Sequence, residues 1–183
     1  FVMGQALAAA GGHDLALRAR AQGHLIGNHT WSHGTAFGAL ADPEEAIEEI
    51  ERTQRLLGDL AEPQRLFRPS GSGAGLLDRN LLSRTALEHL RTGGYTCALW
   101  NCVPQDWLAP DAWVGRALAE LARLDWAVVV VHDLPTGAMR HLDAFIDGVR
   151  ESGAAFTQAL PVACTPVLAG RLLWDPAPLV SGR

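Results

Sequence analysis

Lysine is absent from the chain: all 15 basic residues are arginine, against 20 acidic residues, which gives a formal net charge of -5. This balance argues against a nucleic-acid-binding surface, which needs clustered positive charge. The composition is otherwise that of a globular protein, with 48% hydrophobic and 19% charged residues. We therefore attribute the missing lysine to nucleotide-composition bias rather than to chemistry.

Cysteine is scarce, and long apolar runs are missing. The three cysteines, Cys97, Cys102 and Cys164, form no C-x-x-C pair and leave an odd number, which favours buried or free thiols over disulfides or a zinc knuckle. This usage favours a cytoplasmic location. No stretch approaches about eighteen consecutive apolar residues, so we expect no membrane span. The sequence carries no indication of an oligomeric state.

The chain begins at Phe1-Val2-Met3-Gly4, without an initiator methionine. We therefore expect further residues upstream, and the lack of a signal peptide here carries no information on export. The 183 residues are enough for one domain with a substantial core. We expect that domain over residues 1–158, followed by a Pro-rich extension over 159–183 that packs on it.

Short apolar segments alternate with amphipathic ones, which predicts an α/β fold with a mainly parallel sheet. A helix is expected to start at Asp42-Pro43, with Asp as its N-cap. The apolar run 126–131 is expected to be a strand buried on both faces. The other expected strands are 1–3, 24–27, 66–67, 95–100 and 155–158, and the other expected helices are 5–10, 14–21, 82–91, 111–123 and 139–151.

Two histidines lie four residues apart in the segment 27–33, Gly-Asn-His-Thr-Trp-Ser-His, directly after a short apolar run. If this segment turns helically, His29 and His33 lie on one face and can reach the same ion. The neighbouring Asn, Thr and Ser side chains can orient the ring nitrogens. The spacing alone also fits two structural histidines.

Four polar clusters directly follow expected strands. They are His29 with His33, Arg68 with the glycine-rich stretch 71–75, Asp106 with Trp107, and His132 with Asp133. In parallel α/β folds this edge of the sheet is where active sites are assembled. The common position of the clusters therefore predicts one active site.

Each cluster suits a chemical task. A neighbouring carboxylate can tune the pKa of His132 for a general acid. Arg68 can hold a carboxylate, and the backbone N–H of Gly71 can stabilise an oxyanion. The competing structural interpretations are that His132 only ends a strand, that Asp106 is a turn residue and that Trp107 fills the core.

Taken in order, these segments resemble the polysaccharide deacetylases with a NodB homology domain, carbohydrate esterase family 4. The longest match is 23–33, which resembles the family's second motif. The segments 1–4, 67–69, 106–107 and 130–133 resemble the end of a family strand and the third, fourth and fifth motifs. The resemblance covers roughly residues 1–158 and implies a distorted (β/α) barrel that lacks its first β-α unit.

The resemblance also implies roles for single residues. His29 and His33 would bind a divalent metal, for which Zn²⁺ is expected and Co²⁺, Ni²⁺ and Mn²⁺ are alternatives. Arg68 would orient the catalytic base, and Asp106 would tune His132 as the general acid. Substrate contacts would come from Trp107, Gly71 and Val130.

Two departures from the family pattern bear on function. Ser70 replaces the aromatic residue that usually follows the Arg-Pro of the third motif. The first motif, T-F-D-D, which supplies the base and the third metal ligand, is absent from the chain, and we expect it upstream of Phe1. The resemblance implies a metal-dependent hydrolase that removes N-acetyl groups from a carbohydrate. The alternatives are hydrolysis of an acetyl ester or a cyclic amide, and a non-catalytic carbohydrate-binding domain.

Overall fold

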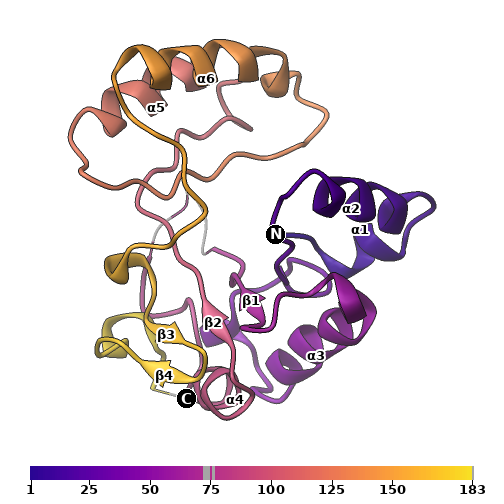
Figure 1. The fold of residues 1–183 in the computed structure, drawn as a ribbon. Coiled ribbons are helices and arrows are strands. Elements are labelled where there is room, and N and C mark those ends of the chain that lie inside the picture. Colours follow the sequence, from indigo (N-terminus) through magenta and orange to yellow (C-terminus); the bar gives the residue numbers. More distant parts are fainter. Residues whose placement is uncertain (72–74, 76, 183) are drawn as a thin grey trace. The chain divides into compact units, whose positions relative to one another are not determined.

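The computed structural model describes residues 1–71, 75 and 77–182. The chain forms two compact units, each with its own hydrophobic core (Figure 1). Unit 1 contains residues 1–99 and 165–183, and unit 2 contains residues 100–164. The division at residue 158 expected from the sequence stays a prediction.

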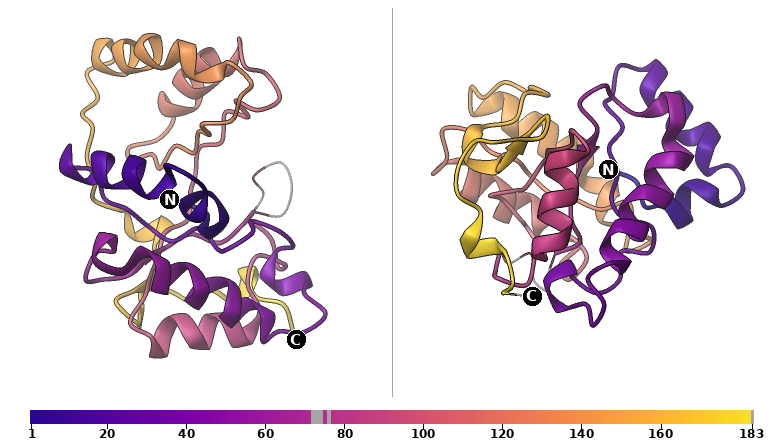
Figure 2. Two further views of the ribbon diagram at one scale, coloured as in Figure 1. Left: turned by 90° about the vertical axis from the view of Figure 1, so that its right-hand side faces the viewer. Right: turned by 90° about the horizontal axis from the view of Figure 1, so that it is seen from below.

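Unit 1 combines short strands with four α-helices. Its elements are α1 (Gly4–Ala8), α2 (Gly12–Ala21), η1 (Phe37–Ala39), α3 (Glu45–Leu57), η2 (Gly58–Leu60), β1 (Leu66–Phe67), α4 (Arg84–Thr92), β2 (Thr96–Cys97), β3 (Val167–Leu168), β4 (Arg171–Leu172) and η5 (Ala177–Leu179). The helices α3 and α4 lie side by side (Figure 2). Ser83 caps α4 by accepting a hydrogen bond from the Ala86 amide.

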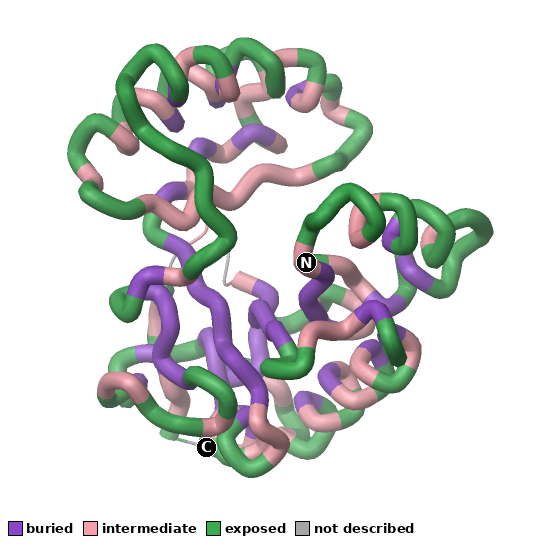
Figure 3. The backbone as a smooth tube through the Cα atoms, viewed as in Figure 1, coloured by how far each residue is buried: buried purple, intermediate pink, exposed green. Residues whose placement is uncertain are grey.

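The sheet of unit 1 has the strand order β1-β2-β3-β4. β1 and β2 are parallel, whereas β3 and β4 are antiparallel to their neighbours. Parallel bridges from Phe67 to Asn28 and from Asn28 to Val2 extend it beyond β1. Residues are buried along β1 and β2 (Figure 3). This mixed α/β arrangement agrees with the predicted fold class, and the segment 165–183 supplies the two antiparallel strands.

Unit 2 contains two helices and two short chain segments, around Cys102 and Val129, that are joined by a parallel bridge. Its elements are α5 (Trp113–Leu121), η3 (Ala138–His141), α6 (Leu142–Glu151) and η4 (Val162–Cys164). The helices α5 and α6 pack together, with Trp113 and Phe145 in ring contact at 5.2 Å between centroids. A parallel bridge joins Cys102 to Val129.

Two strands that the sequence predicts in unit 2 do not form as expected. The run 126–131 forms only the single bridge through Val129, and residues 127–131 are half-buried rather than buried on both faces. A strand needs neighbours on both edges and covered faces to bury every side chain, and here Cys102 is its only bridge partner within unit 2. Residues 155–158 are exposed and form no strand.

The helix α3 packs as its pattern predicts but begins later. The helical spacing of Ala46, Ile47, Ile50, Leu57 and Leu60 predicts an inward-facing stripe. All of these residues are buried except Ile47, which is half-buried, so the prediction is largely confirmed. The helix begins at Glu45, because Asp42 forms a turn first: its side chain accepts a hydrogen bond from the Glu44 amide and its carbonyl accepts one from the Glu45 amide.

All three cysteines are buried and none forms a disulfide, as predicted. Among the described residues, no helix has the length and apolar character that a membrane crossing requires.

Glu51 of α3 joins α4 to β2 through a partly buried polar network. Its Oε1 accepts a hydrogen bond of 2.7 Å from the Tyr95 hydroxyl and lies 2.9 Å from Nε2 of His89. Burial alone would raise the pKa of Glu51, but the hydrogen bonds from Tyr95 and His89 hold this pKa below its ordinary value of 4.5. The ionised carboxylate therefore stabilises the native state.

We expect Tyr95→Phe to lower the free energy of unfolding by about 1–2 kcal/mol at pH 7, because a charge-assisted hydrogen bond is lost. The lowered pKa belongs to the folded state, so this contribution is present above pH 4.5 and is lost as the pH falls through the lowered pKa. Urea denaturation between pH 3 and 7 measures the difference. Glu48→Gln, at an exposed site of the same helix, is the control, and a Tyr95→Phe effect that does not shrink at low pH would contradict the prediction.

Candidate active site

The parallel bridges of unit 1 bring His29 and Arg68 to the same edge of the sheet. The His29 amide donates to the Val2 carbonyl at 3.0 Å, and the Arg68 amide donates to the Asn28 carbonyl at 2.9 Å. Each residue thus directly follows a bridging residue, at the carboxyl end of its segment. This is the edge at which the sequence predicts the active site.

The two histidines meet through a loop and not through a helical turn. Thr30 and His33 have positive φ angles of 64° and 53°, so the backbone between them cannot be an α-helix. The rings of His29 and His33 still lie edge to face, with centroids 4.6 Å apart and planes at 73°. The condition of a helical turn is therefore not met, and the two rings lie close together through a different backbone path.

His29 is held in a defined tautomer. Its Nδ1 lies 2.8 Å from the Arg68 carbonyl oxygen, which only accepts hydrogen bonds, so Nδ1 carries the proton and Nε2 has the lone pair. Burial lowers the pKa of His29 to about 3; the Arg68 carbonyl opposes this shift, and the charges of His33 and Arg68 add to it. The ring is therefore neutral near pH 7, which is the form that binds metals.

Neutral imidazoles suit Zn²⁺ and similar divalent ions. His29 offers Nε2, and the exposed His33 lies beside it. Within the part of the chain that the structure describes, however, no group of three His, Cys, Asp or Glu side chains can hold a metal ion. The pair therefore fits as two members of a ligand set that needs at least one more ligand.

Arg68 is buried, and its carbonyl contacts the His29 ring. Its Nε donates to the Ala98 carbonyl at 3.1 Å, and its guanidinium lies 4.1 Å from the centroid of the Phe1 ring. Gly71 is half-buried. Of the glycine-rich stretch 71–75, residues 72–74 lie outside the described residues.

Unit 2 contains a separate buried carboxylate–imidazole pair. Asp106 is fully buried, and its two oxygens accept hydrogen bonds of 2.9 Å from the backbone amide and from Nδ1 of His132. The side chain of His132 is 30% exposed. The carboxylate thus fixes the ring, with Nδ1 bound to Asp106 and Nε2 as the nitrogen that can exchange a proton with a ligand.

The two bridged segments of unit 2, around Cys102 and Val129, position Asp106 and His132. The Cys102 amide donates to the Val128 carbonyl, and the Val130 amide donates to the Cys102 carbonyl, so the two segments run parallel. Asp106 follows one segment and His132 follows the other. Trp107 is half-buried and lies edge to face with the His132 ring, at 4.9 Å between centroids. Val130 is half-buried two residues before His132.

The sequence profile of the polysaccharide deacetylase family matches residues 1–97. The chain belongs to this family. It is similar to a peptidoglycan-N-acetylglucosamine deacetylase of Bacillus cereus, with 26% identity over 152 residues, which are 78% of this chain and 53% of that protein. It is also similar to a chitooligosaccharide deacetylase of a Bradyrhizobium species, with 29% identity over 130 residues, which are 69% of this chain and 55% of that protein. The chain thus spans about half the length of these curated relatives.

Solved structures of the family share the fold. A family 4 carbohydrate esterase from Streptomyces lividans, in complex with acetate, has a TM-score of 0.70 at 24% identity and covers 91% of this chain and 81% of its own. A family 4 pseudoenzyme from Bacillus anthracis has a TM-score of 0.65 at 17% identity and covers 83% of this chain and 50% of its own. These similarities confirm the predicted distorted barrel of the polysaccharide deacetylases.

The side chains that orient the histidine loop differ in part from those expected. Asn28 and Thr30 hold the backbone and not the ring nitrogens: Asn28 Oδ1 accepts from the Thr30 amide, and Thr30 Oγ1 accepts from the His33 amide. Sequence analysis missed Glu49 of α3, which binds Trp31 and Ser32. Its only signal is a polar position within the amphipathic helix, which does not identify a partner.

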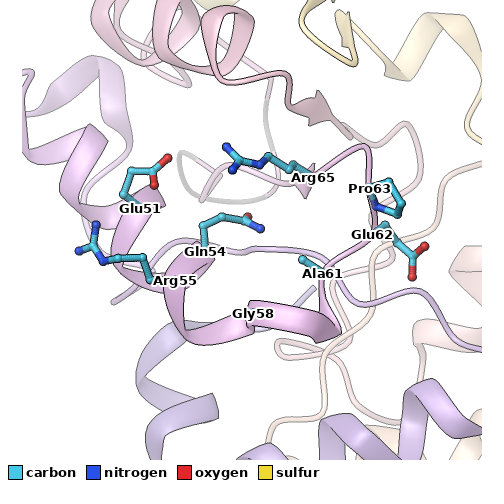
Figure 4. A pocket seen from close by; sticks show the side chains of 8 residues that line it. All are labelled: Glu51, Gln54, Arg55, Gly58, Ala61, Glu62, Pro63 and Arg65. Carbon is cyan, nitrogen blue, oxygen red and sulfur yellow. The ribbon is translucent and has the colours of Figure 1, made fainter.

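A solvent-open pocket of unit 1 lies away from this site. It has a volume of about 360 Å³ and is open to solvent, and Glu51, Gln54, Arg55 and Arg65 are among its lining residues (Figure 4). Arg65 directly precedes β1, whereas Arg68 directly follows it. The pocket and the histidine pair therefore lie at opposite ends of this strand.

The Asp106–His132 geometry predicts the tautomer of the neutral His132 ring. The proton should lie on Nδ1, because the Asp106 carboxylate only accepts hydrogen bonds. In Asp106→Ala, we expect a shift towards the Nε2–H form that exposed histidines prefer, and lower stability because the His132 amide loses its acceptor. ¹⁵N NMR of the ring nitrogens measures the tautomer, with the exposed His24 as internal reference. An unchanged His132 tautomer in the variant would contradict this assignment.

Proposed function

We propose that the protein is a metal-dependent hydrolase that removes N-acetyl groups from an N-acetylglucosamine-type carbohydrate. Membership of the polysaccharide deacetylase family and the deacetylase names of the two curated relatives support this proposal. The observation that carries it is the buried carboxylate of Asp106 bonded to the partly exposed ring of His132. A buried charge is costly, and its use here is to fix an imidazole whose other nitrogen can transfer a proton.

In the proposed reaction, His29 and His33 would hold the metal together with an acidic ligand that the described residues do not bring to them. The Arg68 carbonyl keeps the lone pair of His29 on Nε2. A divalent ion bound there supplies Lewis-acid activation of the acetamide carbonyl and of water. The family's T-F-D-D motif is the proposed source of the missing ligand and of the catalytic base, which Arg68 would orient.

His132 is the proposed general acid. With both nitrogens protonated, the ring keeps Nδ1–H on Asp106 and gives the Nε2 proton to the leaving amine nitrogen, so that the C–N bond breaks with a neutral amine as leaving group. The Asp106 carboxylate stabilises the imidazolium before the transfer. In the same proposal, Trp107 offers an indole face to a sugar ring, Val130 contacts the substrate, and the Gly71 amide binds the developing oxyanion.

A second candidate function is a non-catalytic carbohydrate-binding domain. Two observations favour it: the described residues contain no complete set of metal ligands, and a pseudoenzyme is among the solved structures of this fold. The two candidates differ in what they demand of His132. Binding alone does not require a proton donor, whereas hydrolysis of the amide does.

The test compares variants of the full-length protein with chitooligosaccharides as substrate. We expect His132→Ala to lower kcat by about 10²- to 10⁴-fold with unchanged metal content, since only proton transfer is lost. His29→Ala and His33→Ala should lose bound Zn²⁺. The exposed His24→Ala is the matched control and should change neither quantity.

The outcomes separate the candidates. Acetate release measures kcat, and elemental analysis measures the metal. Normal turnover in His132→Ala would refute the role of His132. A wild-type protein that binds the oligosaccharide without releasing acetate would establish the binding domain. Release from acetylated xylan alone, or opening of a cyclic imide alone, would keep the proposed metal site and change the substrate.

A further inference from the structure

We propose that Glu49 is a positioning residue for the two histidines: its carboxylate fixes the loop between them and thereby the geometry in which they bind metal. The metal part of this inference rests on the proposed function. The structural part, that Glu49 holds the loop, does not depend on it.

A single oxygen of Glu49 accepts three hydrogen bonds from the residues between the histidines. Its Oε2 lies 3.0 Å from the Trp31 amide nitrogen, 2.9 Å from the Ser32 amide nitrogen and 3.1 Å from the Ser32 hydroxyl. Hydrogen bonds to a carboxylate are about twice as strong as those between neutral groups. These contacts reach the amides of two of the three residues that lie between His29 and His33.

The amides of this loop depend on side chains throughout. From residue 30 to residue 33, the acceptors are Asn28 Oδ1, Glu49 Oε2 for two amides, and Thr30 Oγ1. No helix or strand ladder supplies an acceptor in this stretch, and buried or half-buried amides require one. Glu49 therefore provides half of the amide acceptors of the loop.

The carbonyl side of the same loop is held from α1. The Gly4 amide donates to the Thr30 carbonyl at 2.9 Å, and the Gln5 amide donates to the Trp31 carbonyl at 3.0 Å. A Cβ at Gly4 would collide with the Trp31 ring. The loop thus lies between α1, which donates to its carbonyls, and Glu49, which accepts from its amides.

The contacts of Glu49 matter because the loop has an unfavourable backbone conformation. Thr30 and His33 occupy the left-handed region, and this is unfavourable above all for β-branched Thr30. Such a conformation persists only where neighbouring contacts fix it. Without Glu49, we expect the loop to relax and the two rings, now 4.6 Å apart between centroids, to lose their fixed relation.

The helix that carries Glu49 is a firm support. Ile50, which follows Glu49 in α3, is fully buried, and its carbonyl accepts a hydrogen bond of 2.8 Å from Asn28 Nδ2. One turn later, the Arg52 guanidinium lies 3.6 Å from the centroid of the Trp31 ring. The loop is therefore tied to α3 at several points, of which Glu49 binds its backbone directly.

Three variants test this inference: Glu49→Ala, Glu49→Gln and, as control, Glu48→Ala. Glu48 precedes Glu49 on the same helix and is exposed, with an ion pair to Arg55 only. The first readout is hydrogen exchange of the Trp31 and Ser32 amides by NMR in the metal-free chain. The second is Zn²⁺ affinity, by competition with a chromophoric chelator.

We expect at least tenfold faster exchange of both amides in Glu49→Ala, together with a Zn²⁺ affinity lower by about 10- to 100-fold, as for other residues that orient metal ligands. Glu49→Gln should recover most of both, because its amide oxygen can accept the same hydrogen bonds. Glu48→Ala should behave as wild type.

Unchanged exchange and affinity in Glu49→Ala would overturn the inference, as would equal losses in Glu48→Ala. If Glu49→Ala does not fold, Glu49→Asp decides, because its carboxylate is withdrawn from the loop by one methylene: faster exchange of both amides in a folded chain supports the inference, and wild-type exchange overturns it. A wild-type chain that binds no Zn²⁺ would overturn the proposed function and the metal part of the inference, whereas the exchange rates would still decide whether Glu49 holds the loop.

Discussion

The site of unit 1 depends on the double pairing of Asn28. Its backbone forms bridges to Val2 on one side and to Phe67 on the other. His29 and Arg68, which directly follow bridged residues, therefore lie at the same edge of the sheet. The fully buried side chain of Asn28 then ties the sheet to α3 and to the loop, by donating to the Ile50 carbonyl and accepting from the Thr30 amide. The parallel part of this mixed sheet, although its strands are very short, thereby has a fixed carboxyl edge.

The two units use buried or half-buried carboxylates in different ways. Asp106 bonds both the backbone and the ring of His132, so it can influence where the proton lies. Glu49 accepts its hydrogen bonds from the backbone and from Ser32 in the loop between His29 and His33, so its proposed role is to position the two rings. The position of a carboxylate along the chain does not distinguish these roles; the atoms it contacts do.

The sequence predicted what depends on local patterns and on motif order. The polar residues at strand ends, the inward stripe of α3 and the family fold followed from them. It failed where distant contacts decide: the apolar run 126–131 has one bridge partner and remains half-buried, and the histidines meet through left-handed residues that no spacing rule indicates. Glu49 was missed because periodicity identifies a polar position but not the amides that it meets.

The charge around the histidine pair bears on which kind of side chain could complete the proposed metal site. After burial, the positive charges of His33 and Arg68 help to keep His29 unprotonated. His33 binds a metal ion only in its neutral form, so its own charge is absent once an ion is bound. The Arg68 guanidinium keeps its charge and would repel a divalent cation, which carries more charge than a proton in nearly the same place. Two neutral imidazoles contribute no negative charge to offset this repulsion. The proposed metal site would therefore need a carboxylate on electrostatic grounds as well as to complete the coordination, and an acidic residue meets this need better than a third histidine would.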